Sequence, residues 1–251
     1  MLTITSHTGV NLQKVIAIDG PCGSGKSSVA KQVAHSLKIT HIDTGAMYRS
    51  LGLYFSNLGY DLSNLNKTKF KEEILDHLNK LDFVYESSPR LKILINKVDL
   101  TELIRTPNVS NLASLISQYD FIRNFLTDFQ RNLVQETSCV MEGRDIGSVV
   151  FPKAICKFYL TASVDERAKR RVLQLSQNDQ QVEFDNILKE VQERDFKDMN
   201  RDVAPLIQSE DAILIDSTSL SEREVIEQMI THSREKFLKL SQKKLFRIWT
   251  K

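Results

Sequence analysis

The sequence is poor in cysteine: its 251 residues include only Cys22, Cys139 and Cys156. Their number is odd and no two of them have C-x-x-C spacing, which argues against a disulfide framework and against a zinc site. Unpaired thiols suit a reducing compartment. We therefore expect the chain to act in the cytoplasm.

Long apolar runs and an excess of one charge are also missing. No run approaches the roughly 18 apolar residues of a membrane span, and the first residues, MLTITSHTGVNLQ, lack the basic and apolar regions of a secretion signal. The net charge is +2, with 34 Lys and Arg against 32 Asp and Glu. Such a balance does not support nucleic-acid binding by bulk charge. We expect neither a membrane nor a nucleic acid as partner.

The alternation of short apolar runs with amphipathic segments is typical of an α/β domain. Val15-Ile16-Ala17-Ile18 is rich in β-branched residues and stops at a Gly/Pro cluster, as a buried strand does. Strands that alternate with helices form a parallel sheet covered on both faces, here of five strands. The predicted strands are 15–18, 40–43, 138–141, 156–160 and 212–216, and the predicted helices are 27–37, 46–58, 163–175, 184–200 and 221 onward.

Residues 60–137 interrupt this rhythm. Within them, 81–85 and 91–98 read as two strands of a hairpin, and 119–134 as an amphipathic helix. We interpret the region as an insert on the main domain. The basic end of the chain, 234–251, is amphipathic too; a helix packed on the sheet with a solvated lysine face is favoured over a membrane or partner surface.

Residues 20–27, GPCGSGKS, form the pattern G-x-x-x-x-G-K-[ST] between a predicted strand and a predicted helix. Glycines let backbone N–H groups approach phosphate oxygens, and the helix N-terminus favours negative charge. Lys26 supplies a charge for the β- and γ-phosphates, and the Ser27 hydroxyl can ligate Mg²⁺. The expected ATP-binding residues are Gly20, Pro21, Cys22, Gly23, Ser24, Gly25, Lys26, Ser27 and Ser28.

This phosphate-binding loop (P-loop) is compatible with a GTPase switch, an ATPase motor or a kinase of a small molecule. A GTPase carries a guanine-reading N-K-x-D run at the end of a core strand. Residues 96–99, NKVD, match the letters. They lie inside the predicted hairpin of the insert instead, and we do not expect them to bind guanine.

A second anion site is suggested where the second predicted strand ends in Asp43-Thr44-Gly45. Thr44 can cap the helix that follows, whereas Arg49, one turn into that helix, can hold the phosphate of an acceptor substrate. Further arginines gather on the two helices that follow residue 163. They suit a lid that neutralises a migrating phosphoryl group and excludes water: Arg167, Arg170, Arg171, Arg194 and Arg201.

The stretch 140–148, VMEGRDIGS, ends an apolar strand in three charged residues. The pair Arg144 and Asp145 has three interpretations that the residues alone leave open. It can form a salt bridge at a strand edge, Asp145 can help to hold a metal, or both side chains can read a substrate.

At this point the sequence resembles the bacterial cytidylate kinases, a family of nucleoside monophosphate kinases, over nearly its whole length. The likeness rests on seven blocks in the family's order: IAIDGPCGSGKSSVA, HIDTGAMYRSL, IRTPNVSNLAS, MEGRDIGSVVFP, LTASVDERAKRR, ERDFKDMNRDVAPL and ILIDSTSLS. The resemblance implies transfer of the ATP γ-phosphate to CMP or dCMP with Mg²⁺ as cofactor, in a protein that we expect to be a monomer. Its implied organisation is a P-loop kinase core at 14–59 and 138–251, a lid at about 167–200 and an inserted monophosphate-binding lobe at 60–137.

The resemblance also assigns roles to single residues. Thr44 and Arg49 match contacts to the CMP phosphate, with Tyr48 nearby, and Arg144 matches a phosphate-binding arginine. Cytosine presents an amino donor and two acceptors, which the carboxylate of Asp145 and the side chains of Arg123 and Ser114 complement. Three residues match the block that holds sugar and phosphates: Arg194, Asp198 and Arg201. The implied catalytic residues are Lys26, Arg144, Arg167, Arg171 and Arg194.

Departures from the family pattern are small. Cys22 stands where Ala or Ser is more frequent, and Ser148 where Thr is common; neither removes a required donor. Two other functions remain open from the sequence: a kinase of another monophosphate, UMP in particular, and a P-loop switch that binds ATP without turnover.

Overall fold

The computed structural model describes residues 15–65, 68–87, 90–134, 137–177 and 182–249, with side chains except at 68, 69, 107 and 241–249. Its contacts divide the chain into two compact units: Met1–His41 with Glu136–Asn200 and Ala204–Lys251, and Ile42–Gln135 with Arg201–Val203. This division places residues 42–59 in the second unit. The predicted limits of core, lid and inserted lobe (14–59 with 138–251, 167–200 and 60–137) remain a prediction.

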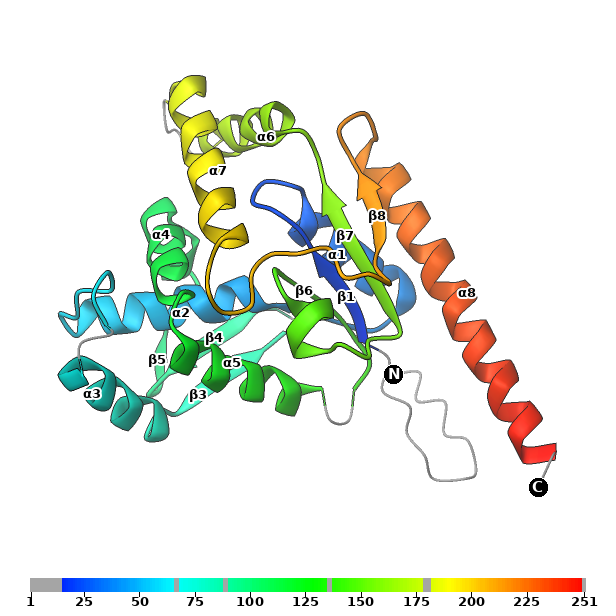
Figure 1. Cartoon of the computed structure of the whole chain (residues 1–251), viewed down its shortest axis with the longest axis horizontal. Helices are drawn as coiled ribbons and strands as arrows, with labels where there is room; N and C mark the ends of the chain where they lie inside the picture. Colours follow the sequence, from blue (N-terminus) through cyan, green and yellow to red (C-terminus); the bar gives the residue numbers. More distant parts are fainter. Residues whose placement is uncertain (1–14, 66–67, 88–89, 135–136, 178–181, 250–251) are drawn as a thin grey trace. The chain divides into compact units, whose positions relative to one another are not determined.

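The first unit is built on the predicted five-stranded parallel sheet, in the order β2-β6-β1-β7-β8 (Figure 1). Its central strand β1 pairs in parallel with β6 and β7, and β7 pairs in parallel with β8. All five residues of β1 are buried, as expected of a strand with neighbours on both sides. The strands are β1 Val15–Asp19, β2 Thr40–Asp43, β6 Cys139–Gly143, β7 Cys156–Thr161 and β8 Ile213–Asp216.

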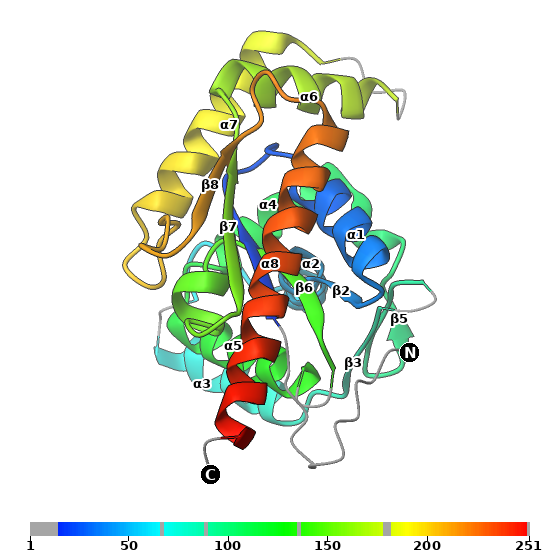
Figure 2. The same ribbon diagram turned by 90° about the vertical axis from the view of Figure 1, so that its right-hand side faces the viewer.

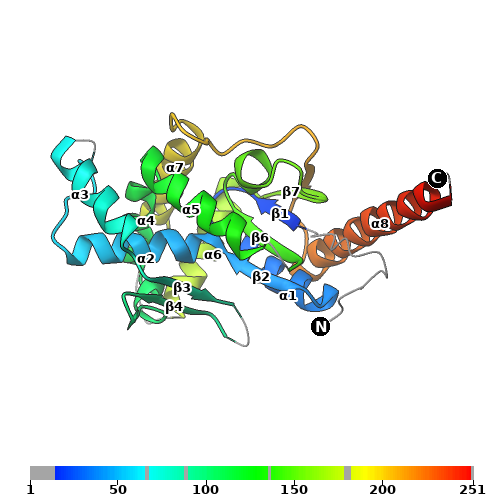
Figure 3. The ribbon, with the colours of Figure 1, turned by 90° about the horizontal axis from the view of Figure 1, so that it is seen from below.

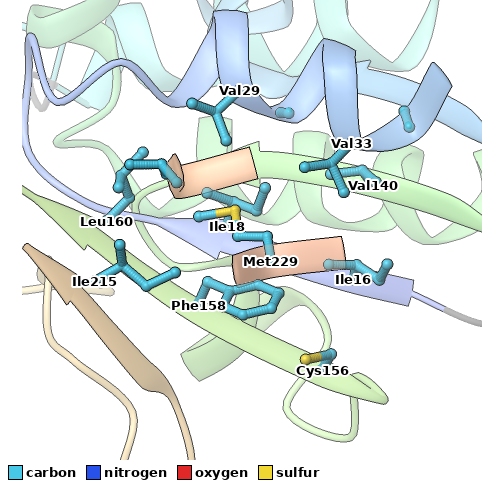
Figure 4. Close-up of a cluster of buried hydrophobic side chains, with 13 residues drawn as sticks. Ile16, Ile18, Val29, Val33, Val140, Cys156, Phe158, Leu160, Ile215 and Met229 are labelled. Atoms are coloured by element: carbon cyan, nitrogen blue, oxygen red, sulfur yellow. The ribbon is translucent and has the colours of Figure 1, made fainter. Parts of the chain in front are cut away.

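Two helices, α1 (Lys26–Leu37) and α8 (Glu222–Trp249), lie side by side on one face of this sheet (Figure 2). Apolar residues of α1 at helical spacing, Val29 and Val33, meet Met229 of α8 and side chains of β1 and β7 (Figure 4). This core fixes the loop between β1 and α1 on a rigid base. The predicted helix from 221 onward is thus confirmed. How its basic end packs lies outside the described side chains, as does the whole N-terminal segment 1–14.

A helical hairpin, α6 (Val164–Ser176) and α7 (Phe184–Met199), has a small core of its own. Ala168 and Leu175 of α6 pack against Ile187 and Val191 of α7, and all four are buried. The predicted helices 163–175 and 184–200 are confirmed within one residue. This separate core makes the hairpin a local substructure that can support the predicted lid.

The second unit combines helices with an antiparallel sheet in the order β3-β4-β5 (Figure 3). Helices α2 and α4 pack against each other. The elements of this unit are α2 Thr44–Asn57, α3 Thr68–Asn79, β3 Phe83–Glu86, β4 Lys92–Ile95, β5 Val98–Asp99, the 3-10 turn η1 Leu103–Arg105, α4 Pro107–Ile116 and α5 Asp120–Leu133. The predicted helix 119–134 is confirmed as α5, whereas α3 and α4 were not predicted.

The predicted strand 91–98 is wrong in one respect, because it is two strands separated by a turn. Asn96 and Lys97 both have positive φ, 49° and 69°, which is the conformation of a tight hairpin turn. The NKVD letters therefore begin in a turn of the small antiparallel sheet. They are not at the end of a strand of the parallel sheet, as a guanine-binding run requires.

Among the described residues, no helix is long and apolar enough to cross a membrane.

Candidate functional site

The P-loop follows β1 directly and closes against β7. Gly20 has φ +153°, and a Cβ atom at this position would lie 2.0 Å from the carbonyl oxygen of Leu160. Only glycine fits so close to a neighbouring backbone. The loop ends at Gly25, the N-cap residue of α1, which has no side chain to cap the first N–H groups of the helix. Those donors can bind an anion.

Lys26 is buried and folds back over the loop. Its Nζ donates to the Pro21 carbonyl oxygen at 2.6 Å and to Ser24 Oγ at 3.2 Å. Burial first, and next the positive charge of Arg144, lower the pKa of this amine to about 7. A phosphate group beside Lys26 would favour its charged form.

Ser27 is held by a carboxylate that the sequence did not single out. Its Oγ donates to Glu142 Oε2 at 2.8 Å, and His41 Nε2 lies 3.0 Å from Glu142 Oε1. Glu142 is 3% exposed and is the penultimate residue of β6. An acidic residue at the end of an otherwise apolar strand was the available signal. Mg²⁺ prefers oxygen ligands, and the hydroxyl of Ser27 with a carboxylate behind it fits that preference.

Arg144 forms its salt bridge with a residue of helix α7. Its Nε donates to Asp198 Oδ2 at 2.8 Å, and Asp198 is 5% exposed. Burial alone would lower the pKa of the Arg144 guanidinium, but Asp198 outweighs burial and raises it. The salt-bridge interpretation thus holds for Arg144, with Asp198 as partner.

Asp19, at the end of β1, is a second buried carboxylate that sequence reasoning missed. It accepts hydrogen bonds from the backbone N–H groups of Ile146 (2.8 Å) and Gly147 (2.7 Å). Burial, with a further contribution from the Asp145 carboxylate, raises the pKa of Asp19 to about 6. Burial of a charged carboxylate costs free energy. Asp19 nevertheless lies buried where the P-loop begins, and it binds the segment of residues 143–147.

The predicted lid arginines have unequal environments. Arg167 is 3% exposed and forms an ion pair with Asp195 at 2.6 Å; its guanidinium also donates to the carbonyl oxygens of Ala162 (2.9 Å) and Cys22 (3.0 Å). It therefore ties the α6–α7 hairpin to the P-loop. Arg170 donates to Ser217 and Glu166, and Arg171 to Gln174.

Four cations nevertheless lie close enough to the P-loop to lower the pKa of the Cys22 thiol. Burial would raise the pKa of this thiol, but its net shift is downward. The lowering comes from positive charges on four different segments of the chain: Arg194, Arg144, Lys26 and Arg171. Arg194 also has a buried Nε atom that, among the described residues, has no hydrogen-bond partner. Positively charged side chains from several segments thus lie around the loop before any phosphate binds.

In the second unit, the start of α2 differs from the prediction. The helix is capped by Asp43, whose Oδ1 accepts from the Ala46 N–H at 3.0 Å, so the capping role that was one possibility for Thr44 belongs to the residue before it. Asp43 Oδ2 also binds Arg49 Nη2 at 2.9 Å. The guanidinium of Arg49 therefore lies at the N-terminus of α2, where it was expected to hold a phosphate.

The predicted base-reading residues of the second unit come from two helices and lie near α2. Arg123 of α5 is 3% exposed, donates to the Ser117 carbonyl oxygen at 3.0 Å and lies over the ring of Tyr48, 5.5 Å from its centre. Ser114, on α4, is half-buried. The unit therefore brings Tyr48 and Arg123 together. Arg201 also belongs to it.

The family model and the curated relatives that match this sequence agree on one family. A family model described as cytidylate kinase matches residues 16–235. A protein named cytidylate kinase from Desulforamulus reducens is 42% identical over 222 residues, 87% of this chain and 96% of that protein. The cytidylate kinase of Thermosipho melanesiensis is 43% identical over 221 residues, 88% of this chain and 97% of that protein.

Proposed function

The chain belongs to the cytidylate kinase family, and we propose that it transfers the γ-phosphate of ATP to CMP and dCMP, giving CDP and dCDP. The observation that carries this proposal is the convergence of Lys26, Arg144, Arg171 and Arg194 on the P-loop. Three of these cations come from outside the loop, as transfer of a phosphoryl group between two nucleotides requires.

The donor nucleotide binds at residues 20–28. Backbone N–H groups at the start of α1 and the Lys26 amine hold its phosphates. Ser27, oriented by Glu142, would hold Mg²⁺ together with phosphates and water, and the ion would neutralise charge on the β- and γ-phosphates. The residues of this chain supply position and charge and need form no covalent bond.

Positively and negatively charged side chains both hold the acceptor nucleotide. Arg49 and Arg144 bind its phosphate, with Thr44 and Tyr48 close to the same group, and Asp145 accepts from the cytosine amino group. The remaining acceptor contacts go to the base and to the sugar and phosphates: Ser114, Arg123, Arg194, Asp198 and Arg201. An acceptor phosphate is already ionised at pH 7, so in-line attack on the γ-phosphorus needs no general base.

The lid arginines stabilise the charge that spreads over the transferred group. Arg171 and Arg194 act directly on it. Arg167 is expected to contribute too, and its contacts to Cys22 and Asp195 hold the lid hairpin on the P-loop. Transfer then takes place away from water.

One activity panel tests the proposal. Purified protein is assayed with Mg-ATP and each of CMP, dCMP, UMP, AMP and GMP, with ADP formation followed over time. We expect CMP and dCMP to be phosphorylated far faster than the others. Preference for UMP would favour a uridylate kinase, and ATP binding without stimulated turnover would favour a P-loop switch.

We further propose that the protein acts in the cytoplasm as a monomer. The three cysteines are free thiols, which suits a reducing compartment. Light scattering after size-exclusion chromatography tests the oligomeric state: 28.8 kDa is the mass of one chain.

A further inference from the structure

The carboxylate of Asp19 binds the main chain of a distant segment, at Ile146 and Gly147. Its two oxygens accept from consecutive backbone N–H groups, Ile146 at 2.8 Å and Gly147 at 2.7 Å. The side chain is 4% exposed, so these are hydrogen bonds shielded from water. They join residues that are 127 and 128 positions apart in sequence.

We propose that Asp19 is a positioning residue for acceptor selection: by holding Ile146 and Gly147, it fixes the main chain that presents Arg144 and Asp145 to the nucleotide. This inference rests on the proposed function, in which Arg144 takes the acceptor's phosphate and Asp145 its base. Nothing in that function requires Asp19 itself to touch a substrate.

The backbone at Asp145 needs such support. Its dihedral angles, φ −144° and ψ 23°, belong to no regular element. After it comes a short π-helical turn, Ile146–Val150, in which the N–H groups of Val149 (2.9 Å) and Val150 (3.1 Å) both donate to the Asp145 carbonyl oxygen. An irregular conformation persists only when its surroundings fix it on several sides. The turn fixes the carbonyl of Asp145, and Asp19 fixes the next two N–H groups.

Gly147 shows how closely the two segments approach. A Cβ atom on Gly147 would lie 3.3 Å from Asp19 Oδ2 and 3.1 Å from Cδ of Lys157. A Cβ atom there would push the carboxylate and the lysine side chain aside by a few tenths of an ångström. The packing thus leaves Asp19 little freedom to bind the segment in another way.

The choice of a carboxylate is informative because a neutral isostere cannot replace it. Asn offers one acceptor and turns an NH₂ group toward the second N–H donor. Aspartate accepts from both N–H groups, but its negative charge is then buried. Burial and the neighbouring carboxylate of Asp145 both disfavour the charged form of Asp19. The charged carboxylate of Asp19 therefore destabilises the fold at a pH above its pKa. We attribute its presence to the accurate placement of residues 144–147.

Asp19 also precedes Gly20, the first residue of the P-loop. Its register partners on the sheet are Gly143 of β6 and Tyr159 of β7. One residue thus connects the segment that binds the donor's phosphates with the segment that selects the acceptor. Misplacement of Asp19 should affect which acceptor is used and not only how fast.

The test compares Asp19→Asn with a matched control, Asp216→Asn. Asp216 is the last residue of β8, which β7 separates from β1 in the same parallel sheet, and it also accepts a local N–H bond, from Thr218, but it is exposed. Steady-state kcat and KM are measured for CMP and UMP at saturating Mg-ATP and pH 7.5. We expect Asp19→Asn to raise the KM for CMP about 10-fold and to lower the CMP-to-UMP ratio of kcat/KM about 10-fold. The control should keep the wild-type ratio.

Equal losses on CMP and UMP, with an unchanged ratio, would show a structural role only and overturn the proposal. If Asp19→Asn does not fold, Gly147→Ala carries the test, because it disturbs the same contact and must lower the same ratio. The wild-type assay separates the two proposals: wild type without CMP kinase activity overturns the proposed function, whereas an active wild type and an unchanged ratio in the variants overturn the role of Asp19 alone.

Discussion

Binding of ATP is expected to load a proton onto Lys26. Burial and the charge of Arg144 lower the pKa of this amine to about 7. Phosphate charges beside the amine favour its charged form and move the pKa back toward the ordinary lysine value, about 10.4. Binding at a pH between these two values must therefore take up protons from the buffer.

The size of the uptake follows from the lowered pKa of about 7. Lys26 is then roughly half protonated at pH 7 and roughly one-tenth protonated at pH 8. Full protonation in the complex gives an uptake of about 0.5 proton per ATP at pH 7, about 0.9 at pH 8 and about 0.1 at pH 6. Because binding requires a proton that becomes scarcer, the affinity for ATP should fall as pH rises above 7.

Isothermal titration calorimetry measures this uptake. Mg-ATP is titrated at pH 6, 7 and 8 in two buffers of different ionisation enthalpy, and the slope of the observed enthalpy gives the protons bound. Lys26→Arg keeps a charge that never titrates and should abolish the uptake. Cys22→Ser removes the thiol that interacts with the same cations, and most of the proton uptake should remain. An uptake below about 0.2 at pH 8, or an undiminished uptake in Lys26→Arg, would refute the reasoning.

Three further changes have expected outcomes. Glu142→Gln leaves Ser27 without its carboxylate and should raise the Mg²⁺ concentration for half-maximal activity by about 10-fold, in an activity titration with Mg²⁺ at fixed ATP; an unchanged curve would exclude the role. Asp145→Ala should reduce the CMP-to-UMP ratio of kcat/KM by roughly 10- to 100-fold, and kinetics unchanged from wild type on both nucleotides would remove it from base reading. Asp19 has a pKa raised from 3.8 to about 6, so its contribution to stability is present below pH 3.8 and lost as pH rises through 6. Between pH 4 and 7 the wild type should lose about 2 kcal/mol of unfolding free energy relative to Asp19→Asn in urea denaturation, and parallel curves would contradict the shift.

The sheet and the P-loop were predictable because their signals are local. A run such as Val15–Ile18 is apolar and β-branched over its whole length, and the glycines of the loop follow it directly. Helix α3 gave a weaker signal: its buried residues Ile74 and Leu78 are spaced by four within a largely charged stretch. The turn at Asn96 and Lys97 lacks the glycine that usually marks positive φ, so the strand appeared continuous.

The partners of the charged residues could not be predicted, because sequence order carries no information about distant contacts. Arg144 was expected beside Asp145 as one functional pair, but its ion pair is with Asp198, 54 residues later. Asp19 and Glu142 were overlooked for the same reason. Each looked like the polar end of an apolar strand, and only the fold shows that they hold Gly147 and Ser27.

A common arrangement explains how a chain with a net charge of only +2 can build a site for two polyanions. Four of the groups expected to meet phosphate or metal are each backed by a carboxylate that is itself partly or fully buried. The pairs are Arg49 with Asp43, Arg144 with Asp198, Arg167 with Asp195, and Ser27 with Glu142. The carboxylates hold the donors in place and offset their charge, so bulk composition does not reveal the site. Removal of one carboxylate should therefore misplace its partner as well as change the local charge, which is why neutral isosteres such as Glu142→Gln are the informative substitutions.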